Sequence, residues 1–100
     1  MNLNKFLRDK HSEYVLSKQV IRSRTSIGAN IQEAYDAVSP ADFINKFSIA
    51  QKECAETSYY LRLLHATDYL DEKMFNSVHT ENQELYRLIM SRLITKKKLR

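Results

Sequence analysis

The sequence predicts an all-α protein, an antiparallel up-and-down four-helix bundle in which the first helix is shortened. The 100 residues include one glycine and one proline, and so few helix breakers indicate long helices joined by short connections. Apolar residues also recur at steps of three and four along most of the chain, which is the spacing of a helix that buries one face. With 43% apolar residues, a chain of this length is expected to form one domain around a small core.

Capping residues and breaks bound the predicted helices. Ser12, Ser39 and Asp71 are candidate N-caps, because their side-chain oxygens can accept hydrogen bonds from the free N–H groups of a first turn. Pro40 fits the first position of the helix after Ser39. The first helix can hold only a turn or two, which leaves a groove where a full first helix would lie. The predicted helices cover about residues 2–10, 13–37, 40–67 and 72–96.

The third predicted helix carries apolar residues on two sides. One seam alternates steps of four and three, which is a heptad pattern, and a second line contains Ile49, Glu56 and Leu63. A helix that is apolar on two sides requires packing partners on two sides, which favours association with copies of the chain. Cys54, the single cysteine, excludes an internal disulfide and is interpreted as a small buried hydrophobic residue. The main seam consists of Phe43, Phe47, Ala50, Cys54, Thr57, Leu61 and Leu64.

Small and polar residues interrupt the apolar stripe of the second predicted helix. Gly28 costs roughly 1 kcal/mol relative to alanine in a helix interior, and a glycine kept there often permits close approach of another backbone. Asn30 and Glu33, together with Glu56 of the third helix, flank the apolar seams. We predict that these three residues form a structural polar core or interface, fixing helix register through hydrogen bonds or contacts across subunits.

The sequence contains no pattern that indicates catalysis or a metal. Di-metal helical bundles use Glu-x-x-His pairs on facing helices, and no glutamate here is followed by a histidine at that spacing. Glu33, Glu53 and Glu56 can supply paired carboxylates, but no nucleophile or phosphate-binding loop accompanies them. We therefore predict a protein that is not an enzyme, with no catalytic residue, no metal and no cofactor.

The net charge of +4 is unevenly distributed along the chain. Residues 25–84 hold ten Asp or Glu and four Lys or Arg, whereas residues 85–100 hold six Lys or Arg and no acidic residue. Such basic ends suit a polyanion, and they are equally typical of a solvated helix terminus, so both interpretations stay open. A ring would repeat each basic patch around its axis and favour phosphate binding. The candidate nucleic-acid-binding residues are Lys18, Arg22, Arg24, Arg87, Arg92, Lys96, Lys97, Lys98 and Arg100.

The residues from about 12 to 70 resemble one known family. The shared pattern comprises Gln19, Arg22, Ser26-Ile27, Ala29-Asn30-Ile31 and Glu33, then Asp42-Phe43, Ile49-Ala50, Glu53, Glu56-Thr57, Leu61-Arg62-Leu63-Leu64 and Tyr69-Leu70. In this order they are similar to the four-helix-bundle family named for proteins encoded in 23S ribosomal RNA intervening sequences. The chain departs from the family pattern in its shortened first helix and at Arg24, where a small residue is more usual.

The resemblance implies an antiparallel four-helix bundle that assembles into a ring, often of five copies, and it does not imply an enzyme. A related branch, the accessory variability determinant of diversity-generating retroelements, binds nucleic acid and a reverse transcriptase.

The sequence contains no run of eighteen apolar residues and no apolar signal core near the N-terminus, so we expect a cytoplasmic protein with no membrane association. We predict a non-enzymatic oligomeric scaffold, a homopentameric ring, that binds RNA, DNA or a nucleic-acid-processing protein through its basic surfaces. The alternative is a structural protein–protein interaction bundle with no nucleic-acid role.

Overall fold

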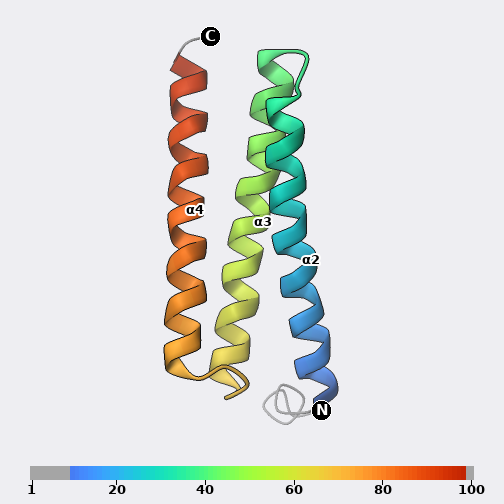
Figure 1. Cartoon of the computed structure of the whole chain (residues 1–100), viewed down its shortest axis with the longest axis vertical. Coiled ribbons are helices and arrows are strands. Elements are labelled where there is room, and N and C mark those ends of the chain that lie inside the picture. The colour runs from blue at the N-terminus through green and yellow to red at the C-terminus, as the bar shows by residue number, and fades with distance from the viewer. Residues whose placement is uncertain (1–9, 99–100) are drawn as a thin grey trace.

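The computed structural model describes residues 10–98, which form three long antiparallel α-helices (Figure 1). Helix α2 spans Lys10–Tyr35, α3 spans Pro40–Ala66 and α4 spans Glu72–Lys98. Helix α3 lies between the other two and packs against both, so α2 and α4 occupy its two sides. The array is elongated, with principal extents of 49 × 23 × 19 Å.

The prediction of a four-helix bundle was wrong, because the described residues contain three helices. The helix predicted at 2–10 lies outside the described residues. Ser12, the expected N-cap, is inside α2 with 1% of its surface exposed, so the break predicted there does not exist. A nine-residue stretch would in any case span only about 14 Å as a helix, too little for a fourth rod beside helices of roughly 40 Å.

The two interhelical connections use the predicted caps. Ser39 is extended, with φ −150° and ψ 157°, and its Oγ accepts a 3.1 Å hydrogen bond from the backbone N–H of Asp42. Asp71 Oδ1 accepts a 2.7 Å bond from the backbone N–H of Met74, which confirms it as a cap. Asp68 has φ 66°, and this left-handed residue reverses the chain between α3 and α4.

The core consists of two apolar clusters separated by a polar layer. The heptad seam predicted on α3 is buried from Phe47 to Leu64, and α2 and α4 cover it. In the polar layer the hydroxyls of Ser23 and Thr57 lie 2.6 Å apart, and Asn82 Nδ2 donates a 2.9 Å hydrogen bond to the Cys54 carbonyl. The clusters are Ile27, Ala34, Phe47, Ala50, Cys54, Ile89 and Leu93, and Leu16, Val20, Leu61 and Leu64.

The thiol of Cys54 is expected to be inert in the folded protein. Its side chain is buried, and burial raises the pKa of the thiol from 9.0 to about 11. Because the thiolate is the reactive form, a disulfide reagent should label Cys54 far more slowly in buffer at neutral pH than in denaturant. The neutral thiol also favours the folded state below its unfolded pKa, and this contribution is lost as the pH rises towards 11. Equal labelling rates with and without denaturant would contradict this prediction.

Candidate interface

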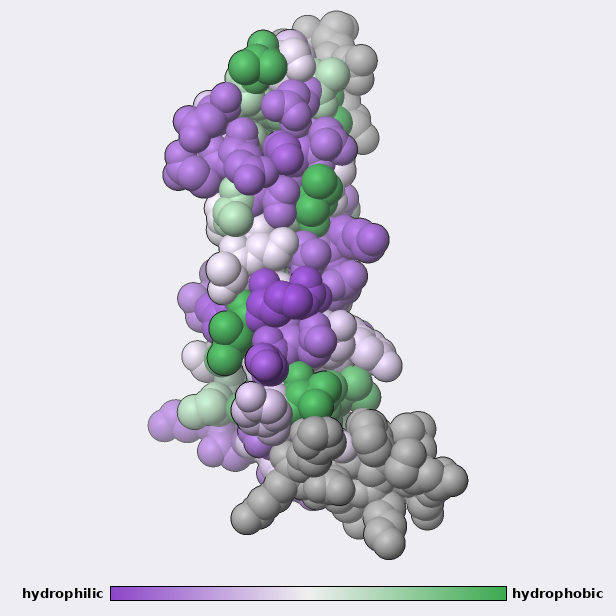
Figure 2. Space-filling view, turned by 90° about the vertical axis from the view of Figure 1, so that its right-hand side faces the viewer, coloured by the Kyte–Doolittle hydropathy of each residue, from purple (hydrophilic) through white to green (hydrophobic). Residues whose placement is uncertain are grey.

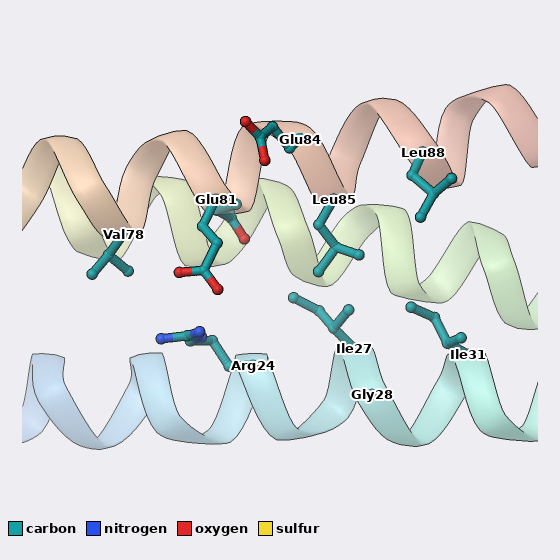
Figure 3. A pocket seen from close by; sticks show the side chains of 10 residues that line it. Arg24, Ile27, Gly28, Ile31, Val78, Glu81, Glu84, Leu85 and Leu88 are labelled. Atoms are coloured by element: carbon teal, nitrogen blue, oxygen red, sulfur yellow. The ribbon is translucent and has the colours of Figure 1, made fainter.

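A groove runs between α2 and α4, with α3 behind it (Figure 3). The main pocket of this groove has a volume of about 430 Å³. Ile27 and Ile31 extend from the α2 wall, and Leu85 and Leu88 from the α4 wall, so their apolar side chains face one another across the opening. The lining residues are Arg24, Ile27, Gly28 and Ile31 on α2, and Val78, Glu81, Asn82, Glu84, Leu85 and Leu88 on α4.

Two smaller hollows extend the groove towards the α2–α3 connection. One, of about 330 Å³, shares Leu88 with the main groove and is also lined by Arg92 and Lys96. The next, of about 370 Å³, shares Phe43 and Lys96 with it and reaches Ser39. The Lys96 ammonium lies 5.0 Å from the centre of the Phe43 ring, so this end of the groove is basic.

Both walls carry exposed residues at seven-residue intervals. On α2 the line is Tyr14, Ile21, Gly28 and Tyr35, with Ile21 67% exposed; on α4 it is Met74, Glu81, Leu88 and Thr95, with Leu88 53% exposed. A seven-residue repeat keeps side chains along one side of a helix and is the repeat by which helices pack in coiled coils. Most of these residues lie outside the buried seams, although the Tyr35 ring packs edge-to-face against Phe43 and Phe47 of α3, with centroids 6.1 and 5.8 Å away. The spacing of the two lines fits a helical occupant.

Gly28 lies on the α2 wall with open space above it. A Cβ atom built at this position meets nothing within 4 Å, so the close backbone approach predicted there does not occur within the described residues. Because Gly28 has no side chain, the backbone of α2 is accessible at this point, and another helix can approach it closely.

The outer surface beside this wall is mostly polar. Figure 2 looks at the α2 side of the molecule and shows hydrophilic side chains over most of it, with apolar ones in separate patches. The walls of the groove therefore form a narrow contact line rather than a broad apolar face.

The groove carries charges of both signs. Arg24 lies on the α2 wall, and Glu81 extends from α4 towards it in Figure 3, with Glu84 one turn away. Arg24 was predicted as a nucleic-acid-binding residue, but it shares its pocket with two carboxylates. Because these carboxylates oppose an anionic ligand, the groove is better suited to a protein surface than to a polyanion.

The other predicted basic residues lie on different sides of the molecule. The Lys18 ammonium is 5.6 Å from the centre of the Tyr14 ring on α2, whereas Arg87 lies on the side of α4 that adjoins α3. Lys97 and Lys98 belong to the last turn of α4, and Arg100 lies outside the described residues. Among the described candidates, Arg24, Arg92 and Lys96 line the groove and its extension, whereas Lys18 and Arg87 lie elsewhere.

Arg22 is held by contacts between α2 and α3. Its Nη2 donates a 3.2 Å hydrogen bond to Glu56 Oε2, its Nη1 lies 3.5 Å from Glu53 Oε2, and its Nε donates to Gln19. The hydrogen bond to Glu56 is the main cause of the raised pKa of Arg22, and Glu53 adds to it. Glu53 Oε2 is buried and has no hydrogen bond, so this ion pair is its only compensation among the described residues.

The predicted polar interface residues have separate roles in the structure. Glu56 bonds to Arg22, and Glu33 pairs with Lys46 at 2.9 Å, so both glutamates connect α2 to α3. Asn30 does not cross between helices, because its amide donates to the carbonyl and hydroxyl of Ser26 one turn earlier in α2. Glu33 is more than half exposed, and the register of α2 and α3 is set in the core rather than by this pair.

The described part of the chain has two further properties that bear on function. No group of three or more His, Cys, Asp or Glu residues in it is placed to hold a metal ion. None of its helices combines the length and the hydropathy that crossing a membrane requires.

The fold and the groove together define an all-α protein of three antiparallel helices with an open side. The chain belongs to the 23S rRNA-intervening sequence protein family, whose model matches residues 1–91, and this confirms the resemblance predicted from its residues. A crystal structure of a protein with unknown function from the S23 ribosomal protein family of Bacteroides thetaiotaomicron is 49% identical, with a TM-score of 0.80, and the match covers 92% of this chain and 85% of that one. Comparison with curated proteins gives no match.

Proposed function

We propose that this protein is a non-enzymatic helical scaffold that assembles with copies of itself through the groove between α2 and α4. The observation that carries the proposal is the pair of exposed seven-residue lines on α2 and α4, which meet the groove at Gly28, Glu81 and Leu88. Their exposed apolar members are Tyr14, Ile21 and Tyr35 on α2 and Met74 and Leu88 on α4, and apolar residues in heptad register favour packing against another helix. The family resemblance of the sequence points in the same direction, because it implies a ring, often of five copies.

A second copy of the chain is the occupant that the charges favour. Arg24 stands on one wall, and Glu81 and Glu84 stand on the other. When two copies pack helix against helix, the cation of one copy can face the carboxylates of its neighbour, and like charges need not meet. The groove of each copy thus carries both the cation and the carboxylates that a contact between two copies would pair.

The absolute molar mass in solution tests this proposal directly. Light scattering on a sizing column should give a discrete multiple of the 11.8 kDa chain, and five copies would match the proposed ring. The mass should fall on dilution only when the concentration approaches the dissociation constant. A monomer at every concentration would refute self-assembly and leave the groove for a different protein.

Gly28→Ala should have opposite effects on the single chain and on the assembly. In the single chain a Cβ at this position meets nothing, so the better helix propensity of alanine should stabilise the fold by up to about 1 kcal/mol. In the assembly the added methyl group should obstruct the approaching helix and lower the fraction of oligomer. Urea unfolding under dilute conditions and light scattering measure the two effects, and Ala29→Ser, one residue away on α2, is the control. A variant that strengthens assembly would contradict the proposed contact.

Nucleic-acid binding is the second candidate function, and the observation that favours it is the basic C-terminal end. Residues 85–100 contain no acidic residue, and Arg92 and Lys96 line one end of the groove. If a ring gathers these ends, RNA or DNA affinity should fall steeply with salt. Neutralising Lys96, Lys97, Lys98 and Arg100 together should then weaken binding, and unchanged binding would exclude this end of the chain.

A further inference from the structure

A second pocket, of about 420 Å³, lies between α3 and α4 on the side away from the α2/α4 groove. Two hydrogen bonds set the helix register at this pocket. Ser58 Oγ and His79 Nε2 lie 2.9 Å apart, and the Asn82 amide donates to the Cys54 carbonyl at 2.9 Å. These contacts fix the relative position of α3 and α4 at the pocket.

Two arginines line this pocket, one from each helix. Arg62 follows Ser58 by one turn of α3, and Arg87 follows Gln83 by one turn of α4. Helical side chains lean towards the N-terminus of their helix, and α3 and α4 are antiparallel. The two arginine side chains consequently lean towards the pocket from opposite directions, and Ser58, Gln83 and Tyr86 also line it.

The charge of this pocket differs from that of the groove. None of its lining residues among the described ones is Asp or Glu, although residues 25–84 hold ten acidic residues. Neither Arg62 nor Arg87 has a carboxylate partner at ion-pair distance within the described residues. Two uncompensated guanidinium groups with neutral hydrogen-bonding groups in the same pocket match the oxygens of a phosphate group.

We propose that the pocket between α3 and α4 binds the phosphate group of a small phosphorylated ligand, such as a nucleoside monophosphate, through Arg62 and Arg87. A hollow lined by one arginine from each helix suits a single phosphate group, whereas a site that follows a nucleic-acid strand requires a row of cations and stacking residues. The proposal is independent of self-assembly, because none of the groove's heptad residues lines this pocket.

Calorimetric titration of the full-length protein with uridine monophosphate, inorganic phosphate and uridine tests the proposal. Uridine monophosphate should bind and uridine, which lacks the phosphate, should not. Binding of inorganic phosphate as well would identify the free anion as sufficient. Arg62→Gln and Arg87→Gln should each weaken affinity about tenfold or more, because a charge-assisted hydrogen bond is lost. Both arginines are exposed, so these substitutions should leave the helices intact.

Arg92→Gln is the matched control, since Arg92 is an exposed arginine of α4 that lines the groove instead. Equal weakening by Arg92→Gln would show general charge attraction and overturn the proposal. Equal binding of uridine would also overturn it. A uridine oligonucleotide whose affinity rises with strand length, and which loses that affinity in Arg62→Gln, would assign the pocket to a nucleic-acid backbone and refute the small ligand.

His79 supplies a readout at the pocket itself. Its ring stacks on Phe75, with centroids 4.8 Å apart, and the other titratable ring on Phe75 is His65, at 4.3 Å. Burial lowers the pKa of His79, and the Arg62 charge lowers it further. A phosphate on Arg62 should offset that charge and raise the His79 pKa, as seen by an NMR titration of the imidazole protons. Arg62→Gln should raise the pKa of His79 in the protein without ligand, and it should abolish the change in that pKa when phosphate is added. A His79 pKa that ignores saturating phosphate would count against the site.

Discussion

Ile89→Ala is expected to lower the free energy of unfolding by about 2–5 kcal/mol, the range for truncating a large aliphatic side chain in a core. Ile89 has 0% of its surface exposed and lies among Ile27, Phe47 and Leu93, so alanine leaves a cavity between the three helices. A domain of this size is stable by only about 5–15 kcal/mol, so this single change removes a large share of the total.

Urea unfolding followed by circular dichroism measures the effect, and Leu88→Ala is the matched control. Leu88 precedes Ile89 in the same helix but is 53% exposed, so its truncation should change the stability of the single chain by about 0.5 kcal/mol or less. The comparison should be made at a concentration where the protein is dissociated. Equal losses for the two variants would show that Ile89 is not at the centre of the core.

The helices and their core seams could be predicted because they depend on local signals. The alternation of four and three along α3 follows from helix geometry alone, and Phe47, Thr57 and Leu64 are buried as that spacing requires. Ser39 and Asp71 were recognisable as caps because each places a side-chain oxygen before a first turn. Ser12 failed as a cap because the helical pattern continues through it, and tertiary packing buried its side chain instead.

The number of helices could not be predicted from the family pattern. The helix at 2–10 was predicted from Leu3, Phe6 and Leu7, which share one side of a helical turn, and the family pattern has four helices, but this segment lies outside the described residues. The groove left on this side was expected, but its exposed heptad lines were missed. The seven-residue spacing of Tyr14, Ile21, Gly28 and Tyr35 is visible in the sequence and is distinct from the buried stripe of α2.

The pocket between α3 and α4 has no local sequence signal. Arg62 and Arg87 are 25 residues apart in the sequence, and they line one pocket only because the register between two antiparallel helices brings them together. That register depends on the contacts of Ser58 with His79 and of Asn82 with the Cys54 carbonyl. Asn82 is a polar residue within the apolar seam of α4, and this interruption is the sequence feature that corresponds to its hydrogen bond with the Cys54 carbonyl.

Leu88→Glu is expected to dissociate the proposed assembly into single chains without loss of helix content. The Leu88 side chain projects into the groove, where the proposed contact would bury it against a second copy. A carboxylate there would lose its hydration without gaining a partner, and it would stand near Glu81 and Glu84. Such an unpaired charge should weaken each contact by about a hundredfold or more.

Met90→Glu separates a specific effect from a general effect of added charge. Met90 is an exposed apolar residue of the same helix, but it lines none of the three hollows of the groove. Its substitution should leave the molar mass unchanged in light scattering, while Leu88→Glu reduces it to that of one chain. If both variants keep the wild-type mass, the groove is not the contact between copies. If Leu88→Glu keeps the mass but lowers the unfolding temperature, the groove is covered within its own chain, because only an intramolecular contact would then bury that carboxylate.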